Sequence, residues 1–275
     1  MTRDALRAGC AVVDTLRVDT DGNRCEESAG VAIEEPLEIR VCGDTLGVTL
    51  RTPGHDVELA AGLLFAEGVI DGVGDLGTVT HCSRGDEDSR GNVIDVTPAA
   101  GVSLSIDDDQ RRSSLTTSAC GVCGRRSIDS LLEARGVVES ELCFPREAIL
   151  RLSSDLRDWQ TVFRSTGGVH AAAAATPAGF AVVREDVGRH NAVDKVIGRL
   201  LLDGLLPASS LALFVSGRAS FEIVHKACCA KIPLVVAVSA PSSLAVGTAE
   251  RLGVTLVGFS RQDGFRVYTH AGRIG

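Results

Sequence analysis

Cys120 and Cys123 lie two residues apart in the stretch TTSACGVCGRRS, residues 116–127. Cysteines at this spacing can bind zinc, cycle between a dithiol and a disulfide, or carry a group on one thiol for transfer. The pair lies among glycine, serine and arginine, whereas cysteines that only fill a core usually lie singly among apolar residues. The stretch is therefore a candidate reactive site with three candidate chemistries.

A zinc site is the least favoured of the three. Structural zinc takes four ligands, commonly from two such pairs, and the chain has no second CxxC. Cys228 and Cys229 are adjacent, so on a helix their side chains would point about 100° apart. Zinc deaminases need H-x-E and P-C-x-x-C. Here there is no H-x-E, and Ala119 precedes Cys120, which argues against deamination.

Disulfide exchange and group transfer both stay open from the residues alone. A redox CxxC normally begins a helix after the first strand of a small βαβ unit, whereas this pair follows more than a hundred residues. Gly121 and Gly124 favour an exposed, flexible loop. Arg125, Arg126 and a helix start expected near Ser127 would stabilise a thiolate. Such a thiolate could accept sulfur as a persulfide and carry it between a donor and an acceptor.

The composition is that of an ordinary globular chain. It has 275 residues, of which 44% are hydrophobic and 23% charged, enough for one large domain or two modest ones. Only 4% are aromatic, which argues against stacking on single-stranded nucleic acid. Nine irregularly spaced cysteines do not fit a secreted disulfide framework. With neither a signal-peptide pattern nor a membrane-spanning apolar run, we expect a cytoplasmic protein with no membrane or nucleic-acid partner.

The net charge of −8 hides an asymmetry between the two halves. Residues 1–110 carry 8 cations against 22 acids, whereas residues 111–275 carry 20 cations against 14 acids. An arginine-rich half suits phosphate, because a guanidinium group can bind it through two hydrogen bonds. The alternative is that these arginines only coat the surface and balance the acidic half.

Residues 1–30 are polar, acidic and without a clear pattern, so we expect a mobile N-terminal arm. From Pro36 onward, alternation and turn residues predict a hairpin over 37–51, a helix over 56–68 and strands over 77–82, 92–98 and 101–107. Asp56 is the expected cap of that helix, and Gly68 its expected end. A helix is expected over 128–135. Another, over 144–168, begins at Pro145 and buries one face. That face comprises Ile149, Leu152, Leu156, Trp159 and Phe163.

The rest of the chain alternates between the two element types. Strands are expected over 169–175, 180–186, 211–217, 233–240, 254–260 and 265–270, with helices over 191–204, 220–231 and 243–253. This alternation predicts a layered α/β sheet that is at least partly parallel. Ligands of such sheets collect beyond the carboxyl ends of the strands. Three loops expected there, 184–191, 216–220 and 260–264, all contain arginine.

Six segments together resemble one known family. They are RTPGHDVELAAGLLFAEGVI, SACGVCGR, REDVGRHNAVDKVIG, SGRASFEIVHKA, IPLVVAVSAPSSLAV and TLVGFSRQDGFRVYT. In this order, from about Pro36 to Thr269, they are similar to the FdhD/NarQ family of formate dehydrogenase accessory sulfurtransferases. The resemblance implies a cytidine-deaminase-like three-layer α/β domain, usually dimeric, with a smaller N-terminal α+β region that carries the CxxC loop. We divide the chain accordingly into an arm (1–30), an N-terminal region (31–140) and an α/β domain (141–275).

The resemblance also implies an activity and its residues. Cys120 would accept sulfur from a cysteine desulfurase as a persulfide, with Cys123 as its partner. The sulfur would pass to the molybdenum cofactor, bis-molybdopterin guanine dinucleotide, needed by the formate dehydrogenase catalytic subunit. The expected cofactor-binding stretch is Phe259, Ser260, Arg261, Gln262, Asp263 and Gly264, where a guanine nucleotide could also bind. Gln262 departs from the glycine expected after the arginine.

Three further residues could complete that pocket. Arg189, His190 and Arg218 lie in the other two loops beyond strand ends. His190 and Asp194 could instead simply pair with each other, four residues apart on a helix. Cys228 and Cys229 are expected to be core thiols. A rival interpretation is a non-catalytic chaperone that binds and shields the same molybdenum cofactor.

Overall fold

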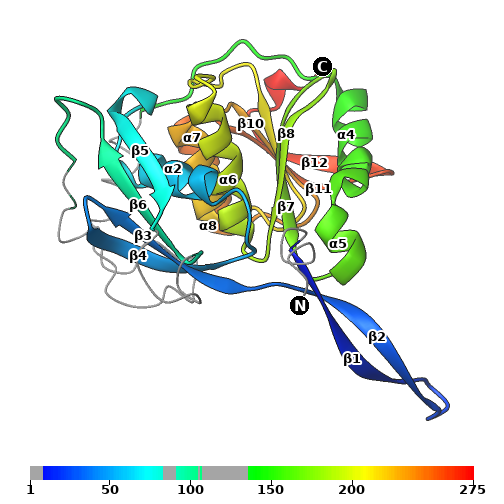
Figure 1. Ribbon diagram of the computed structural model, residues 1–275. Coiled ribbons are helices and arrows are strands. Elements are labelled where there is room, and N and C mark those ends of the chain that lie inside the picture. Colours follow the sequence, from blue (N-terminus) through cyan, green and yellow to red (C-terminus); the bar gives the residue numbers. More distant parts are fainter. Residues whose placement is uncertain (1–8, 83–90, 105, 107–135) are drawn as a thin grey trace.

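The computed structural model describes residues 9–82, 91–104, 106 and 136–275 (Figure 1). At its centre is a six-stranded sheet in the order β12-β11-β10-β9-β7-β8. The strands are β7 (His170–Thr176), β8 (Gly179–Asp186), β9 (Ala212–Val215), β10 (Leu234–Ala237), β11 (Thr255–Arg261) and β12 (Gly264–Thr269). Strands β9, β10 and β11 are parallel, while β7 and β12 run against their neighbours. The predicted mixed α/β architecture is confirmed.

Helices cover both faces of this sheet (Figure 1). One face packs against α6 (Arg189–Leu202), α7 (Phe221–Cys229) and α8 (Ser243–Leu252), and the other against α4 (Arg146–Trp159). The alanine run of β7 contributes side chains to the hydrophobic cores on both faces of the sheet. Ala172 and Ala174 join the first core, and Ala171, Ala173 and Ala175 join the second, as the two-residue period of a strand requires.

A second, four-stranded sheet lies beyond α2 (Asp56–Glu67) in the order β4-β3-β6-β5. Its strands are β3 (Glu35–Val41), β4 (Asp44–Arg51), β5 (Leu76–His81) and β6 (Val93–Pro98). The predicted hairpin and the strands over 77–82 and 92–98 are confirmed. The apolar residues of this sheet and of α2 form one continuous core with those of α6, α7 and α8. The N-terminal region is therefore packed against the central domain.

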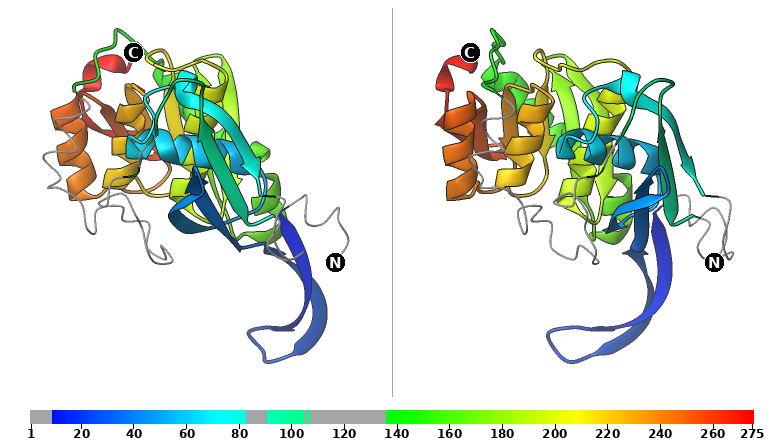
Figure 2. Two further views of the ribbon diagram at one scale, coloured as in Figure 1. Left: turned by 60° about the vertical axis from the view of Figure 1, so that its left-hand side comes forward. Right: turned by 90° about the vertical axis from the view of Figure 1, so that its left-hand side faces the viewer.

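The N-terminal arm differs from the expectation. Residues 10–32 form an antiparallel ribbon of β1 (Cys10–Val18) and β2 (Arg24–Ala32), joined by a tight turn in which Asp19 accepts hydrogen bonds from the backbone N–H groups of Asp21 and Asn23. The ribbon extends away from the rest of the molecule in every view (Figures 1 and 2). Most of its residues are exposed on both faces, so no apolar-polar alternation marks the strands in the sequence.

Three other sequence expectations were wrong in detail. The helix expected over 144–168 is broken at Gln160 into α4 and α5 (Thr161–Thr166), which leaves Trp159 57% and Phe163 38% exposed. No strand forms over residues 102–104 in the described part of the segment expected over 101–107. The N-cap of α2 is His55, in a left-handed conformation, and not Asp56. The helix expected over 128–135 lies outside the described residues.

The other expected elements of the α/β domain are confirmed. Six strands and the helices α6, α7 and α8 form where the alternation placed them. Two short 3-10 helices, Val73–Asp75 and Ala271–Arg273, complete the described elements. Within the described ranges, no helix combines the length and the apolarity needed to cross a bilayer.

An ion pair ties α2 to the edge strand β8. Arg184 donates hydrogen bonds of 2.5 and 2.7 Å to the two carboxylate oxygens of Glu58, and the His55 ring lies 3.5 Å from the same carboxylate. Burial raises the pKa of Glu58, but these hydrogen bonds outweigh it and hold the pKa at about 2. The carboxylate therefore stays charged in the folded protein well below the range in which an unfolded glutamate takes up a proton.

Acid should accordingly weaken the fold through Glu58. Because its pKa is depressed on folding, its contribution is complete above about pH 5 and is lost as the pH falls towards 2. We expect this part of the stability to be about 1–2 kcal/mol after allowance for solvent screening. Urea unfolding of the wild type and Glu58→Gln at pH 7 and pH 4 would show a smaller difference between them at pH 4. An undiminished difference would contradict this assignment.

Candidate functional site

The three arginine-containing loops lie along one edge of the central sheet, at the carboxyl ends of β8, β9 and β11. Ala219, after β9, pairs with Pro241, after β10. The backbone N–H of Phe259, at the end of β11, donates a 3.1 Å hydrogen bond to the carbonyl of Ser239. The predicted convergence of the segments after β9 and β11 is confirmed, with the segment after β10 lying between them.

Two antiparallel strands add residues to the same edge. His170 begins β7 and pairs with Asp186, which ends β8. Because β7 runs against β9, its first residue lies beside the last residues of β9. Arg189 and His190 then begin α6, so they belong to the first turn of a helix and not to the loop that the sequence predicted.

Gly217 lies at the centre of these residues. A Cβ atom built on Gly217 would lie 3.3 Å from Nδ1 of His170 and 4.0 Å from Cδ of Arg189. Arg218 follows directly and is exposed. The structure thus brings Arg189, Arg218 and His170 into one region around Gly217. His170 could not be identified from the sequence, because its place depends on β7 being antiparallel to β9.

His190 is buried and held by a carboxylate. Its Nε2 atom lies 2.6 Å from the carboxylate of Glu222 and 3.2 Å from the hydroxyl of Ser220. The alternative pairing of His190 with Asp194 is wrong, because Asp194 pairs with Lys226 of α7. Both partners come from α7, a helix far along the chain, so helical spacing within α6 could not identify them.

The surroundings of His170 are electropositive. Burial lowers the pKa of His170, and the nearby charges of Arg189, His190 and Arg218 lower it further, against the opposing effect of Asp186. At neutral pH the ring is therefore uncharged. A negative group placed here would relieve the repulsion among the cations, which is the electrostatic character of an anion site.

The stretch 259–264 comprises the end of β11, the turn at residues 262–263 and the first residue of β12. Phe259 has a positive φ of 53° at an irregularity of the strand pairing, and the guanidinium of Arg266 lies 4.9 Å from the centre of its ring. Arg261, Gln262 and Asp263 are exposed. Ser260 is buried, and its hydroxyl lies 2.6 Å from that of Ser153 in α4.

The tip of the hairpin between β11 and β12 therefore exposes the side chains of Arg261, Gln262 and Asp263 to solvent. Gly264 adopts a φ of 149°, a conformation that favours glycine. The hydroxyl of Ser260 is turned into the packing of β11 on α4. Arg266 was not identified from the sequence, although its place two residues after the turn, on the returning strand, could have indicated it.

Two pairs of cysteines were singled out in the sequence. Cys120 and Cys123 lie outside the described residues. Cys228 and Cys229 are buried in α7, as expected for core thiols.

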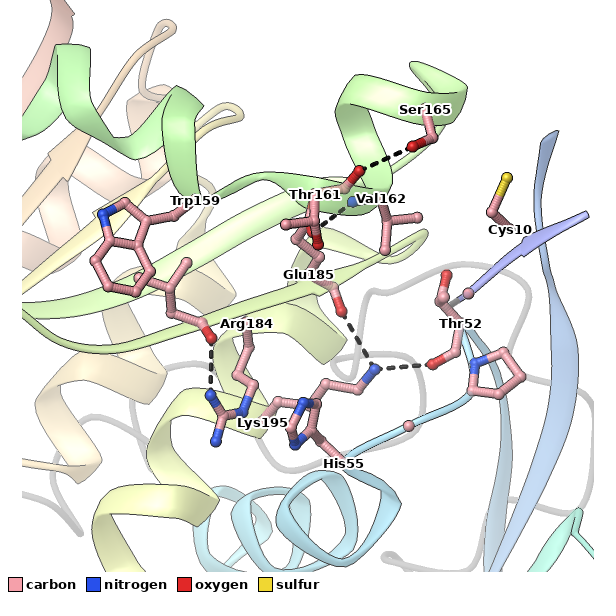
Figure 3. Close-up of a pocket in the computed structure, with 14 residues that line it drawn as sticks. Cys10, Thr52, His55, Trp159, Thr161, Val162, Ser165, Arg184, Glu185 and Lys195 are labelled. Atoms are coloured by element: carbon pink, nitrogen blue, oxygen red, sulfur yellow. Dashed lines mark hydrogen bonds between the residues drawn. The ribbon is translucent and has the colours of Figure 1, made fainter. Parts of the chain in front are cut away.

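A cavity of about 390 Å³ lies elsewhere, between the start of the ribbon, α5 and β8 (Figure 3). None of the predicted site residues that the structure describes lines it. Its charged groups already have partners. Lys195 donates to the carbonyls of Thr52 and Glu185, and the Glu185 carboxylate accepts hydrogen bonds from the backbone of α5 (Figure 3). We therefore take the sheet edge, and not this cavity, as the candidate site.

The fold of this chain is shared with a known protein. The crystal structure of a chain from Desulfotalea psychrophila, described as a formate dehydrogenase accessory protein, superimposes with a TM-score of 0.77 at 26% identity. The match covers 97% of this chain and 99% of that one. The two chains therefore share one fold over nearly their whole length.

Curated sequences extend the similarity. The sulfur carrier protein FdhD of Anaeromyxobacter dehalogenans is 48% identical over 99% of this chain and 93% of its own length. That of Mycolicibacterium paratuberculosis is 48% identical over 93% and 96%. The model of the FdhD/NarQ family matches residues 32–275, which start at the end of the N-terminal ribbon. The chain therefore belongs to the FdhD/NarQ family.

Proposed function

We propose that this protein is a sulfur carrier that takes sulfur onto Cys120 as a persulfide and delivers it to a molybdenum cofactor. The observation that carries the proposal is near full-length similarity to proteins named as sulfur carriers. The Cys120–Cys123 pair supplies a thiol of the required kind in a setting rich in glycine and arginine. The donor would be a cysteine desulfurase, and the enzyme served a formate dehydrogenase.

The loading step balances without an external oxidant. The Cys120 thiolate attacks the outer sulfur of the donor's persulfide, the sulfur–sulfur bond of the donor breaks, and the donor cysteine leaves as a thiolate. One sulfur atom moves, and the number of thiolates and persulfides is unchanged. Release as sulfide takes two electrons, which Cys120 and Cys123 supply if they form a disulfide. A cellular dithiol would then have to reduce that disulfide.

The acceptor is a substrate of this protein and not a resident group. We propose that bis-molybdopterin guanine dinucleotide lies along the sheet edge, against the hairpin tip of residues 259–264 and the residues Arg189, His190 and Arg218. The exposure of Arg261 at the tip and the cationic character of the edge support this placement. A guanine nucleotide offers the same base and phosphate groups and should compete for the site.

Intact mass after incubation with a cysteine desulfurase and cysteine tests the carrier role. The wild type should gain the mass of one sulfur, and a reductant should remove it. Cys120→Ala should show no gain, because the accepting thiolate is missing. Cys123→Ala should still load, and so should the control Cys25→Ala, which removes an exposed thiol of the N-terminal ribbon.

The same variants separate the rival functions. A cofactor chaperone would mature formate dehydrogenase almost normally with Cys120→Ala, whereas a carrier would lose this activity. A dithiol oxidoreductase would depend equally on Cys120 and Cys123 and show a reversible disulfide between them. Absence of any sulfur gain in the wild type would exclude the carrier role.

We further propose the cytoplasm as the place of this step, a homodimer as the assembled state, and a cytidine-deaminase-like relationship for the α/β domain. These proposals follow from the family resemblance of the sequence. Light scattering at several protein concentrations would test the dimer.

A further inference from the structure

The N-terminal ribbon carries apolar side chains on one of its faces. Val12, Leu16 and Val18 are 70%, 52% and 56% exposed. Even numbers of residues separate them along β1, so all three project from the same face. We call these three residues the ribbon stripe. Because a two-stranded ribbon has no core of its own and is barely stable alone, the exposed stripe points to a second surface that covers it.

The ribbon stripe lies on the side of the ribbon that faces α5. Val12 is paired with Gly30, and a Cβ atom built on Gly30 would lie 2.3 Å from the carbonyl oxygen of Ser165 in α5. The same Cβ would lie 3.2 Å from Sγ of Cys10, which lines the cavity beside α5. From this base the ribbon extends away from the molecule, so its own chain leaves the stripe exposed (Figures 1 and 2).

A second apolar surface lies where the ribbon meets the rest of the molecule. Trp159, at the end of α4, is exposed and lines the cavity of about 390 Å³ together with Val162 of α5 and Val183 of β8 (Figure 3). We call α4, α5 and the mouth of this cavity the acceptor surface. The charged side chains of the cavity already have partners within the chain, so the cavity suits an apolar side chain better than a charged group.

The ribbon and the acceptor surface carry opposite charges. Residues 10–32 contain five acids and two arginines, whereas residues 146–166 contain three acids and four arginines. Among the described residues, the exposed Arg157 and Arg164 of the acceptor surface form no ion pair. A ribbon placed on an acceptor surface is therefore attracted to it, whereas two ribbons placed on each other would bring their acids together.

We propose that two copies of this chain exchange their N-terminal ribbons. The ribbon of each copy lies on the acceptor surface of the other, with the ribbon stripe against Trp159 and the cavity mouth. A nine-residue strand spans about 30 Å, which is long enough to cross from one copy to the other. One chain supplies both halves of this contact, so a two-fold axis forms it twice. The inference rests on the homodimer proposed above, whose interface it names, and not on the sulfur carrier role.

Sedimentation velocity of the full chain tests the exchange. At about 20 µM the wild type should sediment as a dimer. Leu16→Asp should raise the dissociation constant at least about 100-fold, because every dimer loses two buried leucine side chains. The matched control Leu205→Asp replaces a leucine of nearly equal exposure, 50% against 52%, that lies after α6, and it should leave the dimer unchanged.

A mixture of two variants tests whether the ribbon binds the acceptor surface. Trp159→Asp should also weaken the dimer, because it places an acid opposite the acidic ribbon. Leu16→Asp mixed with Trp159→Asp should associate more tightly than either variant alone, since one of the two contacts in the mixed dimer then joins an intact ribbon to an intact acceptor surface. Circular dichroism checks that the variants are folded, and Phe163→Asp, on the same surface, replaces Trp159→Asp if that variant unfolds.

The outcomes separate the exchange from the sulfur carrier role. A monomeric wild type, or a Leu16→Asp dimer as tight as that of the wild type, would overturn the exchange even if Cys120 loads sulfur. Failure of the mixed variants to associate would overturn the acceptor surface and indicate ribbons packed on each other. If Leu16→Asp dissociates and the mixture recovers while the wild type gains no sulfur, the exchange stands and the carrier role fails.

Discussion

Replacing Lys195 with methionine is expected to lower the free energy of unfolding by about 3–5 kcal/mol at neutral pH. The Lys195 ammonium is 2.7 Å from a carboxylate oxygen of Asp186, and the two side chains are 1% and 0% exposed. Its remaining hydrogen bonds go to the carbonyls of Thr52, at 2.9 Å, and Glu185, at 3.3 Å. Methionine has similar length but no charge, so it would leave the Asp186 carboxylate buried without its counter-ion.

The decrease in the free energy of unfolding caused by Lys195→Met should be smaller at acidic pH. Burial raises the pKa of Asp186, and in the wild type Lys195 opposes this effect. Without Lys195, Asp186 would fold more readily when protonated, and a group whose pKa is raised on folding contributes stability that is lost as the pH rises. Urea unfolding followed by circular dichroism should therefore show a smaller deficit at pH 5 than at pH 8.

A matched control lies one turn further along α6. Arg199 pairs with Asp203 at 2.7 Å, but the two side chains are 46% and 35% exposed. Arg199→Met should lower the free energy of unfolding by less than about 1 kcal/mol, since exposed ion pairs contribute little to stability. A similar loss for Lys195→Met and Arg199→Met would refute the role assigned to the buried pair.

A methyl group added at Gly198 is expected to destabilise the fold by about 3 kcal/mol or more. A Cβ built there would lie 1.8 Å from the carbonyl oxygen of Glu58, and one at Gly62 would lie 2.0 Å from that of Asp194. Both clashes are with backbone atoms, which cannot rotate away. Glycine at these two positions therefore lets α2 and α6 approach until their backbones touch.

Gly247 of α8 supplies the control for Gly198→Ala. It is also a helical glycine, but nothing lies within 4 Å of a Cβ built on it. Gly247→Ala should be neutral or stabilise by up to about 1 kcal/mol, since alanine is the better helix former. Chemical unfolding of both variants would compare them directly. If Gly198→Ala changed the free energy of unfolding no more than Gly247→Ala does, α2 and α6 could separate without cost, and the prediction would be wrong.

Both predictions concern the support of the sheet edge. Lys195 and Asp186 hold the end of β8 and the segment at Thr52 together, directly before the first turn of α6. Gly62 and Gly198 fix α6 against α2. A displacement of α6 would move Arg189 and His190 relative to the loop that carries Arg218, so weaker anion binding should accompany the loss of stability.

Much of the fold could be predicted from the sequence, because its signals are local. The alternation in β3 and β4, the glycine that ends α2, and the regular exchange of apolar strands and helices after residue 169 each act within a few residues. The order of the segments along the chain was enough to indicate the family. The position of two arginine-containing loops beyond strand ends followed from the parallel pairing that such alternation favours.

Only the tertiary structure decided which residues meet. His190 pairs with Glu222, and Asp194 pairs with Lys226. Both partners belong to α7, about 30 residues further along the chain, so these pairs replace the local His190–Asp194 pair that was expected within α6. His170 reached the site because β7 runs antiparallel to β9, a choice of pairing that alternation does not encode. The ribbon of residues 10–32 was missed because both its faces are exposed. Local patterns record which face of an element is buried, whereas the partners across a site depend on how distant elements pack.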